Sequence, residues 1–121
     1  MHRWLLAFSL LGLVPGCKGE DEVPAGATCG KKPLPDCPLQ KWMKDNMKPA
    51  FDQKDTGALA KALDHVAEHP PSGFAGWDTI AKKGADAART GDIDAVKAAC
   101  KSCHDDQRPR FKKEIRDKPL F

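Results

Sequence analysis

The segment Cys100-Lys101-Ser102-Cys103-His104 carries the most specific chemistry in this 121-residue chain. On a helix, residues three and four positions apart share a face, so both thiols and the imidazole would point the same way. The order C-x-x-C-H is the pattern of covalent c-type haem attachment. We therefore expect one haem c, with Cys100 and Cys103 bonded to the porphyrin edge and His104 bound to the iron.

Two other kinds of site use a cysteine pair at this spacing, namely a redox dithiol and half of a zinc site. A zinc site would need Cys29 and Cys37 as its second half, and their separation is irregular for zinc. A thioredoxin-like dithiol needs a βαβ context, and no segment of the chain alternates in the manner of a strand. Both remain as alternatives behind the haem interpretation.

Cys29 and Cys37 enclose a short loop with the turn residues Gly30, Pro33 and Pro35. We expect these two cysteines to form a disulfide, because export to an oxidising compartment is indicated by the start of the chain.

The chain begins with a short basic segment, then an apolar run from Trp4 to Val14, then Pro15-Gly16-Cys17. This order is typical of a signal peptide, and the run is too short to cross a membrane as a helix. The segment from Val14 to Cys17 resembles a bacterial lipobox. Residues 1–16 are therefore predicted to be a lipoprotein-type signal peptide, and Cys17 the lipidated first residue of the mature protein.

The predicted organisation has a lipid-anchored tether with the Cys29–Cys37 loop at 17–36 and a folded domain at 37–121. We expect the protein to be exported and anchored on the periplasmic side. Lys18, in place of the Asp associated with inner-membrane retention, favours the outer membrane. Charged residues make up 31% of the chain and are mixed in sign, so nucleic acid is not an expected partner.

Apolar residues recur at helical spacing in four segments, and antiparallel packing of four such helices into a bundle is the predicted fold. The first helix begins at Pro38 and is expected to kink or end near Lys48, because Pro49 follows. The other helices are predicted at about 55–69, at 74 or 75 to 90, and from the N-cap Asp92 to at least 106, with a break or kink at Pro109.

With its C-x-x-C-H on the last helix, this pattern resembles the cytochrome c′/c556 class over roughly residues 37–115. The segment from Gln40 to Asn46 is similar to the first-helix segment that holds the distal methionine in c556-type members. The resemblance implies Met43 as the second axial ligand, with Met47 as the alternative one turn later. It also implies a haem propionate contact for Arg108, with Arg110 a weaker candidate, and a homodimer formed through the first helices.

The expected function is electron transfer by a six-coordinate His/Met haem that meets redox partner proteins through small, transient interfaces. The principal alternative is a five-coordinate haem protein that binds NO or CO. Bis-His ligation through His65 or His69 is a further alternative. A peroxidase would need a distal acid–base pair, for which His65 with Glu68 or Asp64 is the only hint, so we do not expect an enzyme.

Overall fold

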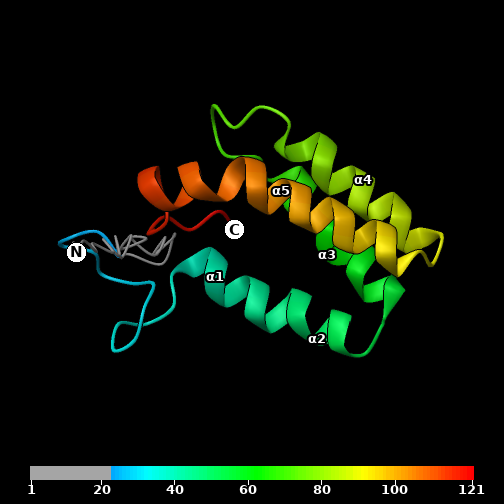
Figure 1. Ribbon diagram of the computed structural model, residues 1–121, viewed down its shortest axis with the longest axis horizontal. Helices are drawn as coiled ribbons and strands as arrows, with labels where there is room; N and C mark the ends of the chain where they lie inside the picture. Colours follow the sequence, from blue (N-terminus) through cyan, green and yellow to red (C-terminus); the bar gives the residue numbers. More distant parts are fainter. Residues whose placement is uncertain (1–22) are drawn as a thin grey trace, which may run out of the picture.

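The structure, a computed structural model, describes residues 23–121, and its regular elements are all helical (Figure 1). In chain order they are α1 (Pro38–Trp42), the π-helical turn η1 (Met43–Met47), α2 (Lys48–Asp52), α3 (Thr56–Glu68), α4 (Trp77–Arg89) and α5 (Ile93–Glu114). The first three are continuous and are called here the 38–52 helix. With no strand between residues 23 and 121, the predicted all-α class is confirmed for this part of the chain.

The predicted signal peptide, the lipidated Cys17 and the first part of the tether lie outside the described residues. Within them, none of the helices combines the length and the apolar character needed to cross a membrane.

Of the two alternatives predicted near Lys48, a kink or an end, the end is wrong, because the 38–52 helix passes Pro49 without ending. Proline has no N–H for the carbonyl four residues earlier, and its ring collides with that carbonyl in a regular α-helix. Here the preceding turn widens, and the Lys48 N–H donates to the carbonyl of Met43, five residues back. The helix thereby continues for one more turn to Asp52 and keeps both methionines on its length.

Local sequence signals set several helix ends where they were predicted. Pro38 occupies the first turn of α1, where its missing N–H costs nothing. The side chains of Asp55 and Asp92 cap α3 and α5 by accepting the N–H groups of Ala58 at 2.9 Å and Ala95 at 3.0 Å. Gly91, at φ +77°, follows the end of α4 in the left-handed conformation that terminates helices.

Helix α4 begins at Trp77, two to three residues later than predicted. Contacts from α5 hold the preceding segment as a loop: Gln107 donates to the carbonyl of Ala75 at 2.8 Å, and Arg110 donates to that of Gly73 at 2.6 Å. The Arg110 guanidinium also lies 4.4 Å from the centre of the Phe74 ring. These partners are distant in the sequence, so helical periodicity alone could not locate this boundary.

Helix α4 packs against α3 on one side and α5 on the other, while the 38–52 helix contacts α3 (Figure 1). Gly84 permits a close approach of α3 and α5 to α4, because a Cβ added there would lie 3.2 Å from Leu63 Cδ1 and 3.3 Å from Ala99 Cβ. Many of the buried residues of α3 and α4 are small, and they include Ala60, Ala67, Ala81, Ala85 and Ala88.

Helix α5 also continues through its proline, Pro109, so a break there is not found. The turn beyond it is secured by Phe111, whose ring centre lies 6.2 Å from that of Phe74 and 6.0 Å from that of Trp77. All three rings are buried. Aromatic packing of this kind stabilises the last turns of α5 against the start of α4.

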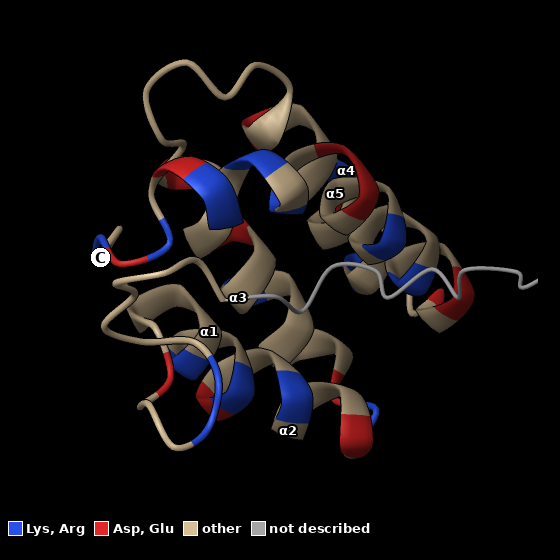
Figure 2. Ribbon diagram, turned by 60° about the vertical axis from the view of Figure 1, so that its left-hand side comes forward, with Lys and Arg blue, Asp and Glu red and all other residues tan. Residues whose placement is uncertain are grey.

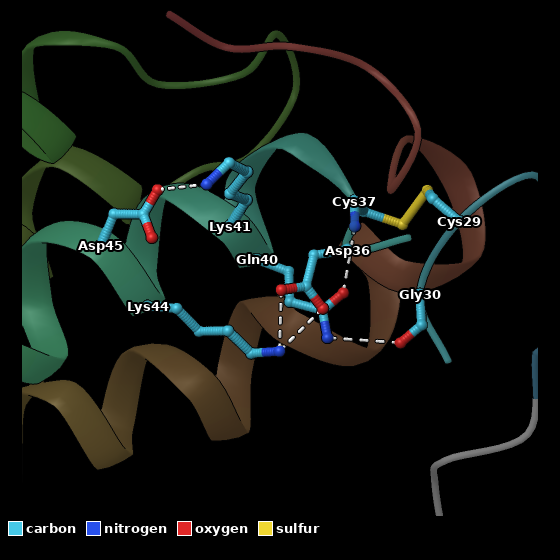
Figure 3. Close-up of polar contacts among 8 residues, drawn as sticks. All are labelled: Cys29, Gly30, Asp36, Cys37, Gln40, Lys41, Lys44 and Asp45. Atoms are coloured by element: carbon cyan, nitrogen blue, oxygen red, sulfur yellow. Dashed lines mark hydrogen bonds and ion pairs between the residues drawn. A yellow bond between two sulfur atoms is a disulfide. The ribbon is translucent and has the colours of Figure 1, made fainter. Parts of the chain in front are cut away.

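A disulfide joins Cys29 to Cys37, with an S–S distance of 2.02 Å (Figure 3). Gln40, in the first turn of α1, fixes the same loop from the helix side. Its Oε1 accepts the Cys37 N–H at 3.1 Å, and its Nε2 donates to the carbonyl of Gly30 at 3.2 Å. The loop and the start of the 38–52 helix are thus held as one unit.

Replacing Trp77 by Phe should lower the free energy of unfolding by about 0.5–1.5 kcal/mol, because the carbonyl of Val66 loses the shorter of its two hydrogen bonds and keeps only that from the His69 N–H at 3.3 Å. In the native protein Trp77 Nε1 donates to that carbonyl at 2.9 Å. Urea unfolding followed by far-UV circular dichroism would measure the change. Trp42→Phe is the control, since Trp42 is only half-buried and its stacking contact can be kept by Phe. Equal losses in the two variants would contradict the role given to the hydrogen bond.

Candidate functional site

A cavity of about 720 Å³ opens among the 38–52 helix, α4 and α5. Its walls are largely apolar and include Leu39, Phe51, Val66, Trp77, Ile80 and Phe111. Cofactor pockets in proteins span about 300–1,000 Å³ and have mostly apolar walls with a few polar groups. The cavity therefore has the size and lining of a cofactor site.

The residues predicted to attach the haem and to bind its iron through His/Met ligation line this cavity. Cys100, Cys103 and His104 line it from α5, and Met43 and Met47 line it from the 38–52 helix. Met47 is buried, whereas Met43 and the two cysteines are half-buried. The 38–52 helix and α5, whose site residues are more than fifty positions apart, thus place both thioethers and the C-x-x-C-H in the same cavity.

Arg108 lines the same cavity from one turn beyond His104, whereas Arg110 does not. Arg110 is used by the fold instead: besides its contacts with Gly73 and Phe74, its Nε donates to the Glu114 carboxylate at 3.0 Å. Of the two arginines, only Arg108 is placed to meet an acidic group held in the cavity.

His65 and His69 are not among the residues that line the cavity. His65 stacks on the Trp42 ring at 5.5 Å, and the two imidazoles lie next to each other with ring centres 4.5 Å apart. Asp64, which was considered with His65 as the acid–base pair of a peroxidase, forms an ion pair with Arg89. The structure therefore does not bring the histidines considered for bis-His ligation, or a distal acid–base pair, to the C-x-x-C-H.

Burial keeps the two thiols protonated. It raises the pKa of Cys100 above its ordinary value and that of Cys103 to about 11, with the negative charges of Cys100 and Asp106 adding to the second shift. Catalytic and redox-active thiols need the opposite, a lowered pKa and a populated thiolate. These cysteines therefore do not have the character of a redox dithiol.

The pKa of His104 is lowered, first because the surrounding protein desolvates the charged imidazolium and then because Arg108 repels it. Both effects favour the uncharged ring. A neutral imidazole has a free nitrogen lone pair, which is what a metal ligand requires.

Basic side chains from both walls surround the cavity, and none of the described residues lining it is acidic. They are Lys31, Lys44, Lys48, Arg108, Lys112 and Arg116. Some are partly neutralised: Lys44 pairs with Asp36 at 2.7 Å (Figure 3), and Lys48 with Asp52 at 2.6 Å. Lys and Arg occur along both the 38–52 helix and α5 (Figure 2). The cavity is thus suited to an apolar ligand with anionic groups.

Among these cations, only Arg108 was predicted from the sequence to contact the haem. A signal was present, because His104, Arg108, Lys112 and Arg116 follow at four-residue steps and so share one face of a helix. From the sequence, Lys112 and Arg116 were interpreted as part of a solvated basic tail.

No protein family, no curated protein and no solved structure matches this chain.

Alkylation should report the raised pKa of Cys103. In the folded, haem-free protein at pH 7.5, the thiolate population of Cys103 should be about a hundredfold smaller than that of an ordinary thiol. A more basic thiolate is a stronger nucleophile, and this should recover about tenfold of the lost reaction rate. We expect iodoacetamide to modify Cys103 about ten times more slowly in the folded chain than in urea, as measured by mass spectrometry of the digested protein. Equal rates in the two conditions would show that the thiol is not desolvated.

Proposed function

We propose that this chain is a mono-haem c-type cytochrome of the cytochrome c′/c556 type that carries out electron transfer. The observation that carries the proposal is the shared cavity: C-x-x-C-H on one wall, Met43 and Met47 on the other, apolar surfaces between them and cations around them. The contacts of Gln107 and Arg110 with the loop before α4 also support an antiparallel four-helix bundle, because they join the end of α5 to the start of α4.

The residues of the cavity fit a haem. Cys100 and Cys103 would each add a thiol across a vinyl group, forming thioethers, and the neutral His104 would bind the iron. The apolar walls exclude water from the porphyrin faces, and Arg108 would pair with a propionate through its planar guanidinium. When bound, the haem supplies an iron that alternates between the ferric and ferrous states.

Met43 is proposed as the second axial ligand, with Met47 as the alternative. Both thioethers belong to the π-helical turn that Pro49 imposes, and both line the cavity. Turns of this type recur at functional sites because they redirect side chains within a helix. Ligation by His and Met raises the potential of a haem and keeps its coordination unchanged between oxidation states, which suits electron transfer.

The proposal includes export and lipid anchoring through Cys17, so that the carrier stays near membrane-bound redox partners. The disulfide supports this location, since such bonds persist in oxidising compartments such as the bacterial periplasm.

The visible spectrum of protein matured in a host that attaches haem c tests the proposal. We expect covalent haem, a low-spin ferric spectrum and the charge-transfer band of Met–Fe(III) ligation. Met43→Leu should abolish this band and give a high-spin form, whereas Met47→Leu should retain it. Ile80→Ala, which changes the cavity wall without removing a sulfur, is the control.

Three other outcomes have distinct meanings. Loss of the band in Met47→Leu alone would assign the ligand to Met47. A high-spin native protein that binds CO or NO rapidly would replace electron transfer by the five-coordinate gas-binding function. Absence of covalent haem after maturation would overturn the cytochrome proposal.

A further inference from the structure

A second cluster of metal-binding side chains lies at the end of α3, away from the cavity. His65, Glu68 and His69 each offer a ligand atom, and these atoms all lie within 4.8 Å of one another. The two histidines are half-buried, and Glu68 is exposed. Their spacing of three and four residues brings them together on one side of the helix end.

One hydrogen bond prepares His69 for metal binding. Its Nδ1 lies 2.8 Å from the carbonyl oxygen of His65. Because a carbonyl can only accept, the proton must be on Nδ1, and the lone pair is therefore on Nε2. Histidines that bind metal ions in proteins characteristically donate their other ring N–H to a carbonyl or carboxylate in this way.

Neighbouring rings restrict the imidazoles further. His65 stacks on Trp42, and Phe121 lies 4.4 Å from the His65 ring and 5.2 Å from the His69 ring. Side chains held in this way lose less conformational freedom when they bind an ion, so the site is partly preorganised.

We propose that His65, Glu68 and His69 form a binding site for a divalent transition-metal ion of the zinc type. Two imidazoles and a carboxylate are a known three-ligand zinc set, and they leave the fourth position open for water or another ligand. Imidazole ligands favour zinc, copper and nickel over magnesium and calcium, which prefer oxygen.

The geometry needs only a small adjustment. With zinc–ligand bonds of about 2.0–2.2 Å, two ligand atoms on a tetrahedral ion lie roughly 3.4 Å apart. The atoms of this cluster must therefore approach by about 1.4 Å at most. Glu68 can provide this by rotation, because its side chain is exposed.

The order H-x-x-E-H, here from His65 to His69, also occurs in a class of zinc enzymes in which a helix carries the two histidines. In this chain His69 follows the last residue of α3, and the cluster is not part of the large cavity. We therefore assign metal binding to it and no hydrolytic reaction.

The site would connect α3 to the 38–52 helix. Trp42 rests on His65 and directly precedes Met43, which lines the cavity. An ion that fixes the two imidazoles would therefore also fix the surface on which Trp42 packs. Any ligand that binds only the native state stabilises it, so zinc should raise the thermal unfolding midpoint.

Zinc binding by the untagged, haem-loaded protein tests the proposal. Equilibrium dialysis against ZnCl₂ should give one bound ion per chain. His69→Ala and Glu68→Gln should each weaken binding by about tenfold or more, because each removes a ligand atom. Asp94→Asn, which neutralises an exposed carboxylate on α5, is the control and should bind zinc as the native protein does.

Haem-free protein needs a separate arm, because its two cysteine thiols are free and also bind zinc. The double variant Cys100→Ala/Cys103→Ala should retain the bound ion, and its loss there would place the ion at the C-x-x-C-H and overturn the proposal. Native zinc affinity in both His69→Ala and Glu68→Gln would also overturn the proposal. If His69→Ala does not fold, the exposed Glu68→Gln variant decides the question. None of these results depends on whether the protein transfers electrons.

Discussion

The close approach of α3 and α5 to α4 at Gly84 is the contact on which the rest of the structure depends. Leu63 and Ala99 meet at this glycine from opposite helices, so a Cβ there would be crowded by both and its neighbours would have to move by a few tenths of an ångström. Ala99 is followed directly by Cys100, and both line the cavity. The contact with α4 thus fixes one side of α5 and leaves the C-x-x-C-H on the side that faces the 38–52 helix.

This arrangement divides the interior into two parts with different properties. On one side, small residues and the aromatic rings of Phe74, Trp77 and Phe111 make a packed core. On the other, apolar walls surround about 720 Å³ of open space. Apolar surface left in contact with water does not stabilise the fold, so a bound macrocycle would add burial that the chain lacks by itself. Cofactor binding and stability are therefore coupled in the proposed cytochrome.

The two proposed metal sites differ in the way their ligands are prepared. In the cavity, desolvation raises the pKa of both thiols and lowers that of His104, so it favours the uncharged form of each group, and a neutral imidazole is what iron ligation requires. At the end of α3, a hydrogen bond to a backbone carbonyl sets the proton of His69, and aromatic rings hold the imidazoles in place. Trp42 joins the two regions, since it packs on His65 and belongs to the helix that carries Met43.

The sequence by itself determined the helical class, the caps at Asp55 and Asp92, the stop at Gly91 and the residues of the C-x-x-C-H, because these depend on local spacing and on single side chains. Only the tertiary structure decided the course of the helices at Pro49 and Pro109. A proline removes one hydrogen bond, but a widened turn at Met43–Met47 and the burial of Phe111 compensate for that loss. The cavity, its cationic surround and the contact between His65 and Trp42 likewise join residues that are distant along the chain, and no local pattern encodes such proximity.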